Sequence, residues 1–251
     1  MSEQELYDSL YQSIIVDDKI SFLGQILQRA ARKCPNTIAL ICKDRQVRYR
    51  ELYYYASQLS KTLRDRGIKP RDRILLFFEN SIEFYIGYFG ILQVGAVVCP
   101  LNTFLREHEL SHIIADAQPT LIISSTKLLH RIKENEIKKL PPILTEENMI
   151  VEGPVSDDFS DISIDMLPFD EMAVLLYTSG TTGLPKGVML SSRNTIINVI
   201  QSVARFNFVE YERGFAVLPL FHSFAQNTCV WAVVLMCCTA IVVPHIERRA
   251  I

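Results

Sequence analysis

The residues with the clearest capacity for chemistry lie in one short segment, Tyr177 to Gly187, which reads YTSGTTGLPKG. Its glycines let the backbone approach a ligand closely, and its hydroxyls and its lysine add donors and charge. Successive backbone N–H groups in such a segment form a concave anion site. The spacing matches neither the G-x-x-x-x-G-K-[ST] phosphate loop nor the G-x-G-x-x-G dinucleotide motif. We therefore predict a polyphosphate site of another type, with an ordinary flexible turn as the alternative.

A second pattern, from His108 to His112, matches the H-E-x-x-H motif of zinc proteases, with Glu109 in the place of the general base. The helix phase argues against a zinc site, because the apolar residues form a stripe on the other side of the predicted helix. That stripe consists of Leu110, Ile113, Ile114 and Ala117. Both histidines are then expected to face solvent without a third ligand. Zinc hydrolysis stays a distant alternative.

Strands and helices alternate along the chain, which favours an α/β fold with mostly parallel sheets flanked by helices. A hairpin is predicted at 40–42 and 47–49. The remaining strands are expected at 74–78, 96–99, 121–124, 173–177 and 215–218. Helices are expected at 50–66, from 81 to near Gly95, at 106–117, 127–136 and 192–206, with Asn80 predicted to cap the second of them.

Two stretches depart from this alternation. Residues 140–167 are rich in proline, glycine and acidic residues, and we expect a loop-rich connector with one or two short strands. The apolar run from Cys229 to Val243 is shorter than the roughly 18–20 residues that span a bilayer. It is predicted to form a buried helix followed by a buried strand. We also expect this run to be poorly covered by the rest of the chain.

Residues Leu176 to Val188 resemble the signature loop of the acyl-adenylate-forming (AMP-binding) enzyme superfamily. Further segments stand in the order usual for that superfamily, and the resemblance covers about residues 20–244. These segments are Tyr49–Leu52, Asp72–Ile74, Asn80–Phe84, Gly95–Asn102 and Leu218–His222. Within the superfamily, the chain is most similar to fatty acyl-CoA synthetases and next to acyl-carrier-protein ligases.

The resemblance implies a division of the chain and a limit to its activity. Residues 1–19 would be an N-terminal extension, and residues 20–251 the first part of the large N-terminal domain, incomplete at its C-terminus. The mobile C-terminal lid domain would be absent. We accordingly expect the isolated chain to lack full adenylation activity. A catalytically incomplete protein that at most binds nucleotide is the alternative.

The implied reaction is a two-step ligation, in which a carboxylate reacts with ATP to give an acyl-adenylate and a thiol then displaces AMP. The cofactors would be ATP, Mg²⁺, and coenzyme A or an acyl carrier protein as acceptor. The residues that the resemblance assigns to ATP are Thr178, Ser179, Gly180, Thr181, Thr182, Gly183 and Lys186. Thr178 would also contact Mg²⁺, and Lys186 and His222 are the candidate catalytic residues.

His222 also bears on the substrate, although a histidine at this kind of position is often a buried core residue. Members that activate amino acids usually carry Asp at this place, to hold the ammonium group of the substrate. The histidine, between Phe221 and Ser223, points to a fatty acid instead. Ala225 stands where long-chain enzymes often have glycine, which would shorten the acyl chain that fits.

Charge and cysteine content narrow the possible partners. Lys and Arg total 26 against 28 Asp and Glu, and this balance lacks the basic excess of nucleic-acid-binding proteins. The six cysteines show no metal-ligand spacing, and the acidic N-terminus does not resemble a signal peptide, so a cytoplasmic location is expected. A peripheral membrane contact stays open, and the oligomeric state is not predicted.

Overall fold

The computed structural model of the chain describes residues 2–133, 140–149, 167–178 and 183–244. Its longer helices are α1 (Glu3–Tyr11), α2 (Gln25–Lys33), α3 (Tyr49–Asp65), α4 (Ile82–Gln93), α5 (Glu107–Ala117) and α7 (Ser192–Phe206). Shorter turns of helix are η1 (Gln12–Asp17), η2 (Thr126–Leu128), α6 (Leu129–Lys133), η3 (Glu146–Asn148), α8 (Ser223–Ala225), η4 (Gln226–Ala232) and α9 (Val233–Leu235).

The strands form two sheets. The larger has the order β6-β5-β3-β4-β7-β8 and is parallel except for β8, which pairs with β7 in the antiparallel sense. Its strands are β3 (Arg73–Phe77), β4 (Val97–Pro100), β5 (Leu121–Ser124), β6 (Ile143–Thr145), β7 (Met172–Thr178) and β8 (Lys186–Ser191). The smaller sheet has the order β2-β1-β10-β9, with strands β1 (Ile38–Cys42), β2 (Arg45–Arg48), β9 (Arg213–Ala216) and β10 (Thr239–Val242). The predicted α/β class with mostly parallel sheets is confirmed.

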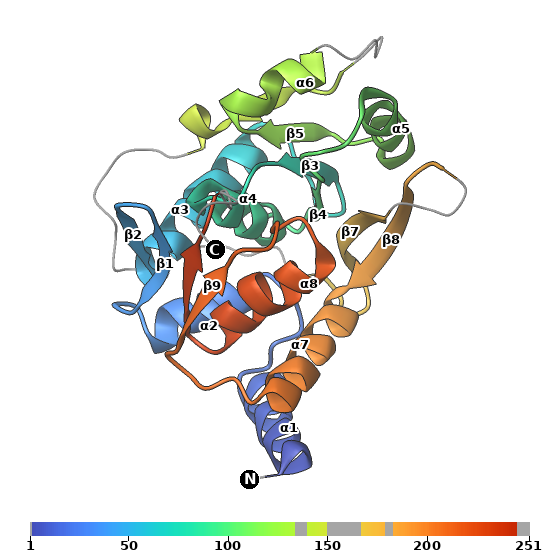
Figure 1. Ribbon diagram of the computed structural model, residues 1–251. Coiled ribbons are helices and arrows are strands. Elements are labelled where there is room, and N and C mark those ends of the chain that lie inside the picture. Colours follow the sequence, from blue (N-terminus) through green and yellow to red (C-terminus); the bar gives the residue numbers. More distant parts are fainter. Residues whose placement is uncertain (1, 134–139, 150–166, 179–182, 245–251) are drawn as a thin grey trace.

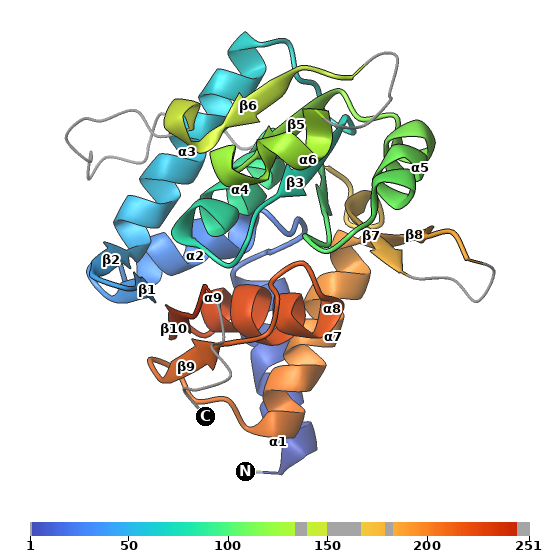
Figure 2. The same cartoon turned by 45° about the horizontal axis from the view of Figure 1, so that its top comes forward.

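Successive side chains of β3 point to two different cores, as the pleat of a strand requires. Ile74 and Leu76 face the core that contains α3 and α4, whereas Leu75 and Phe77 face the core that contains α5. Helix α4 contacts β3 and β4 of the large sheet and also β1 of the small one. Figures 1 and 2 show α3 and α4 between the two sheets. This shared helical layer holds the sheets together.

The small sheet buries its inner face and leaves its outer face partly open. Leu40 and Ala240 are register partners and fully buried, whereas Phe215 on β9 is 67% exposed. The apolar run folds as predicted, into helical turns η4 and α9 followed by strand β10. The expectation that this run is poorly covered was wrong, because residues 230–240 are all buried in the helical layer and the small sheet. Among the described residues, no helix has the length and apolar character needed to cross a membrane.

The structure corrects two local predictions. Ser81, not Asn80, caps α4, because the Phe84 N–H donates to Ser81 Oγ at 3.2 Å. The glycine-rich segment leads into strand β8, whereas no strand was predicted between that segment and the helix at 192. Helix α7 begins at Ser192, as predicted, after Ser191 has capped it by accepting a bond from the Asn194 N–H at 3.1 Å.

Candidate functional site

The β7–β8 hairpin carries the predicted phosphate segment. Thr178 and Lys186 are register partners at the end of this antiparallel pair where the connecting segment joins the two strands, and both are exposed. Between them, Gly183 has φ +96°, a conformation that favours glycine. Thr178, Gly183 and Lys186 are therefore brought to one end of the hairpin. The predicted residues Ser179, Gly180, Thr181 and Thr182 lie outside the described residues.

Helix α5 lies beside this hairpin, and two side-chain contacts between described residues join them. The His112 Nε2 atom lies 3.1 Å from the Pro185 carbonyl oxygen, and the Tyr177 hydroxyl donates to Asp116 Oδ2 at 2.6 Å. Burial, and then the hydrogen bond to Asp116, raise the pKa of Tyr177 above its usual value. The hydroxyl therefore keeps its proton and its role as donor at neutral pH.

These contacts correct the prediction that both histidines of the H-E-x-x-H pattern face solvent. His108 is exposed, but His112 is half-buried and bonded to the hairpin. The apolar stripe opposite them is buried as predicted. Within the described ranges, no group of three His, Cys, Asp or Glu side chains is placed to hold a metal ion. The pattern therefore has no third protein ligand there.

The segment before His222 is held by Asn80, which follows the end of β3. The Asn80 side-chain amide donates to the carbonyl oxygens of Leu218 at 3.0 Å and Val243 at 3.2 Å. Its Oδ1 atom accepts a bond from the Leu220 N–H at 2.8 Å. Asn80 is only 8% exposed, and unpaired polar groups at such a site would be costly. This one side chain thus ties the large sheet to the ends of β9 and β10.

A second contact fixes the same segment from the other side. The Gln226 side-chain amide donates to the Phe221 carbonyl oxygen at 2.9 Å, and Gln226 Oε1 accepts from the buried Tyr88 hydroxyl at 2.9 Å. The backbone that carries His222 is therefore anchored both to α4 and to the end of β3.

His222 itself is exposed, which contradicts the alternative of a buried core histidine. The Phe224 N–H donates to His222 Nδ1 at 3.3 Å. A ring nitrogen that accepts a hydrogen bond carries no proton, so the neutral imidazole has its proton on Nε2. No hydrogen bond among the described residues engages Nε2. The ring can therefore donate a hydrogen bond to a carboxylate oxygen from outside.

Aromatic side chains lie on both sides of His222 in the chain. Phe224 is 51% exposed, and the ring of Phe221 packs edge-on against Phe104, with 6.5 Å between centroids. A cavity of about 450 Å³ opens beside Phe221, between the ends of the two sheets. Its walls combine apolar side chains with the charged side chains of Glu79 and Arg131.

Lys186 and His222 belong to different parts of the fold. Lys186 lies on the edge strand of the large sheet, and His222 follows β9 of the small sheet. No contact joins them among the described residues, so any ligand that meets both must extend from one sheet to the other.

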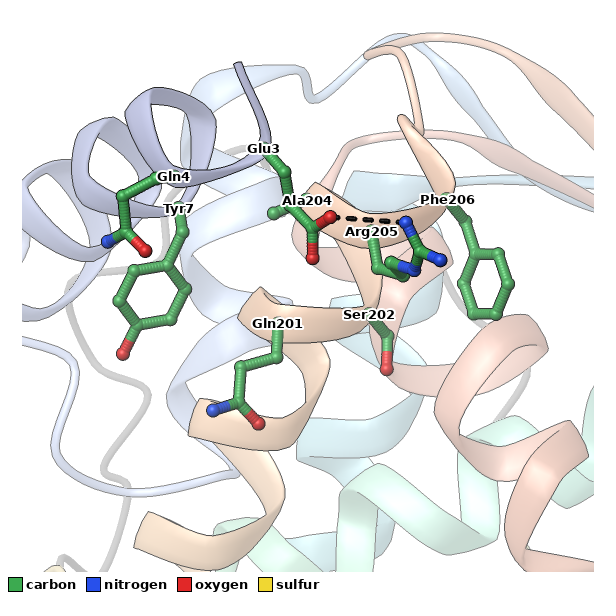
Figure 3. A pocket seen from close by; sticks show the side chains of 8 residues that line it. All are labelled: Glu3, Gln4, Tyr7, Gln201, Ser202, Ala204, Arg205 and Phe206. Carbon is green, nitrogen blue, oxygen red and sulfur yellow. Dashed lines mark hydrogen bonds and ion pairs between the residues drawn. The ribbon is translucent and has the colours of Figure 1, made fainter.

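Another groove, of about 680 Å³, lies between α1 and the C-terminal half of α7 (Figure 3). Glu3 and Arg205 form an ion pair across it at 3.2 Å, with Tyr7, Gln201 and Phe206 nearby. It contains none of the predicted site residues. It also lies at the end of α7 away from the hairpin, so we assign it no role.

Comparisons with known proteins identify the family of the chain. The model of the AMP-binding enzyme family matches residues 27–251, and the chain belongs to this family. Gramicidin S synthase 2 of Brevibacillus brevis is 30% identical over 203 residues, which are 79% of this chain. The chain spans only 4% of the length of that relative.

Solved structures extend the likeness to the fold. The N-terminal domain of FACL13 from Mycobacterium tuberculosis superposes with a TM-score of 0.78 at 24% identity, covering 91% of this chain and 58% of that one. O-succinylbenzoate coenzyme A synthetase from Bacillus subtilis, in complex with ATP and magnesium ion, gives 0.77 at 22% identity, covering 89% and 58%. The fold is thus that of the N-terminal domain of adenylate-forming enzymes.

Proposed function

We propose that this chain binds MgATP and takes part in the activation of a carboxylate as its acyl-adenylate. The observation that carries the proposal is the pairing of Thr178 with Lys186 at the end of the β7–β8 hairpin. It places a hydroxyl and an ammonium group at the two ends of a segment rich in glycine, serine and threonine. Membership of the AMP-binding family supports the same reading.

In the proposed reaction, a carboxylate oxygen attacks the α-phosphorus of ATP, and pyrophosphate leaves. Lys186 would neutralise part of the negative charge that develops on the leaving group. Ser179, Gly180, Thr181, Thr182 and Gly183 would supply donors and close backbone approach. A thiol of coenzyme A or of an acyl carrier protein would then attack the acyl carbon and release AMP.

Magnesium would share the charge of the polyphosphate, with the Thr178 hydroxyl as a protein ligand. Mg²⁺ is commonly held by one or two protein oxygens together with substrate phosphates and water. Thr178 is exposed at the start of the segment, which fits a role as a magnesium ligand.

We further propose that the carboxylate is apolar, with fatty acids as the first candidates. His222 can donate from Nε2 to the carboxylate, and Phe221 and Phe224 provide apolar contacts. His222 also occupies the place of the Asp that usually holds an amino-acid ammonium group. Activation of amino acids is the second candidate, because gramicidin S synthase 2 is among the curated relatives.

The test of the nucleotide site is a titration of the chain and its Lys186→Ala variant with MgATP. Loss of a charge-assisted contact should weaken binding about 10- to 100-fold. Lys61→Ala is the control, since Lys61 is an exposed lysine on α3. Equal affinities for the Lys186→Ala and Lys61→Ala variants would refute the proposed phosphate contact.

The substrate is tested by ATP–pyrophosphate exchange with fatty acids of several lengths and with amino acids. Exchange with fatty acids that is reduced by His222→Ala would support the proposed class. Exchange with amino acids alone would favour the second candidate. Binding of MgATP without exchange for any carboxylate would favour the nucleotide-binding alternative.

A further inference from the structure

We propose that helix α5 is a latch that holds both ends of the phosphate segment, with His112 and Asp116 as positioning residues. Figures 1 and 2 both show α5 beside the β7–β8 hairpin. The proposal rests on the proposed nucleotide site and adds to it the residues that fix its position. It also gives a role to a histidine of the H-E-x-x-H pattern that involves no metal.

The first contact holds the end of the segment that leads into β8. A carbonyl oxygen can only accept, so His112 Nε2 donates to the Pro185 oxygen, 3.1 Å away. Pro185 is buried and directly precedes Lys186. This contact therefore acts one residue away from the proposed phosphate-binding ammonium group.

The second contact holds the end of the segment that leaves β7. Tyr177 directly precedes Thr178, and its hydroxyl donates to Asp116 at 2.6 Å. The Tyr177 ring lies over Gly187, its register partner, where an added Cβ would come within 3.4 Å of the ring. Tyr177 thus crosses the hairpin and reaches α5 from the residue next to Thr178.

The two latch residues lie on one side of α5, because positions four apart are neighbours on a helix surface. The other side of the helix is fixed to the large sheet. Leu110 and Ile113 are buried in the same core as Leu75 of β3 and Leu175 of β7. Helix α5 is thus anchored to the sheet while His112 and Asp116 reach the hairpin.

The hairpin needs such support because β8 is an edge strand with little burial. Val188 is 42% exposed and Met189 is 72% exposed. Edge strands with few buried contacts open at low free-energy cost. Without the latch, Thr178 and Lys186 would keep their register but lose a fixed position relative to the rest of the sheet.

The first measurement is hydrogen exchange of the 251-residue chain without nucleotide. His112→Ala should speed exchange of the β8 amides and leave the central strands β3 and β5 unchanged. His108→Ala is the matched control, since His108 belongs to the same motif but is exposed. His112→Gln should restore slow exchange, because its amide nitrogen can donate in the place of Nε2.

The second measurement is MgATP affinity for the same variants and for Tyr177→Phe, which removes only the hydroxyl. His112→Ala and Tyr177→Phe should each weaken binding about three- to tenfold, and His112→Gln should recover most of the loss. Where exchange activity is measurable, KM for ATP should rise while KM for the carboxylate stays constant.

The two proposals can fail separately. If the wild-type chain bound no MgATP, the proposed function would fail, and the β8 exchange rates alone would decide the latch. If His112→Ala matched His108→Ala in β8 exchange, the latch would be wrong whether or not the wild type bound nucleotide. Unchanged MgATP affinity in both His112→Ala and Tyr177→Phe, with a wild type that binds, would equally overturn it.

Discussion

At the scale of single residues, Gly183 sets a backbone requirement that other residue types meet only at a cost. Its φ of +96° lies in a region that residues with a Cβ rarely adopt, yet an added Cβ would meet no atom of the described residues within 4 Å. Gly214 is equally open in space but has no such φ. Alanine substitutions at positions 183 and 214 therefore differ in backbone strain but not in steric conflict.

We predict that Gly183→Ala weakens MgATP binding, because alanine must either pay about 1–3 kcal/mol of strain or leave the native conformation. The expected loss of affinity is about five- to a hundredfold. Gly214→Ala should bind as the wild type does. Titration of both variants with MgATP checks this, and equal binding by Gly183→Ala and wild type would show that the conformation at 183 is not needed.

At the scale of elements, the contact between α3 and α4 depends on Gly90. An added Cβ at Gly90 would lie 2.7 Å from a Leu59 methyl group and 3.0 Å from the Ala56 carbonyl oxygen. At Gly87, one turn earlier, the only such close contact is a Leu76 methyl group at 2.6 Å. A side-chain methyl can move aside more easily than a backbone carbonyl.

We predict that Gly90→Ala destabilises the chain by about 1–3 kcal/mol, because the helices must separate. This outweighs the gain of about 1 kcal/mol that alanine brings to a helix. Gly87→Ala should cost less. The measurement is the free energy of unfolding in urea, and a stabilised Gly90→Ala variant would contradict the close packing.

The elements also show what the sequence could and could not predict. A short apolar run predicted β5 at its observed bounds, and the helical periodicity did the same for α7, because β5 is buried on both faces and α7 on one. Strand β8 was missed because it lies at an edge and is largely exposed, so no core face marks it. Asn80 and Ser81 are both good cap residues, and only the structure distinguishes them.

Within the proposed site, the phosphate segment and His222 were predicted through a resemblance to family motifs. It did not indicate which residues support them. The contacts of Asn80 with Leu220 and of Tyr177 with Asp116 join residues 140 and 61 positions apart, and no local pattern records such pairs. The helix phase predicted the side of α5 on which His112 lies. It did not predict that the β7–β8 hairpin lies against that side.

At the scale of the whole molecule, three buried tyrosine hydroxyls join the shared helical layer to the C-terminal part of the fold. Tyr49 donates to the Cys238 carbonyl oxygen at 2.6 Å, Tyr85 to that of Cys229 at 2.9 Å, and Tyr88 to Gln226 at 2.9 Å. Burial raises the pKa of all three well above the usual value of 10.0.

These tyrosines predict a loss of stability at alkaline pH. Each of the three tyrosines has a pKa that is higher in the folded than in the unfolded chain. Their contribution to the free energy of unfolding is therefore complete below pH 10 and is lost as the pH rises towards the folded-state pKa values. The urea midpoint should therefore fall above about pH 10, and Tyr85→Phe should make the fall shallower. Tyr11→Phe, at an exposed position, should not. A midpoint that stays constant with pH would contradict the prediction.

The pairing of β1 with β10 has a consequence for the synthesis of the protein. Leu40 and Ala240 are register partners 200 positions apart in the chain. At about 5–20 residues per second, a ribosome needs roughly 10–40 s to make that stretch. Throughout that interval the β1–β2 hairpin has an unpaired edge, and an isolated hairpin is only marginally stable. Until β10 has been made, the edge of β1 therefore lacks its partner strand and is open to pairing with another polypeptide.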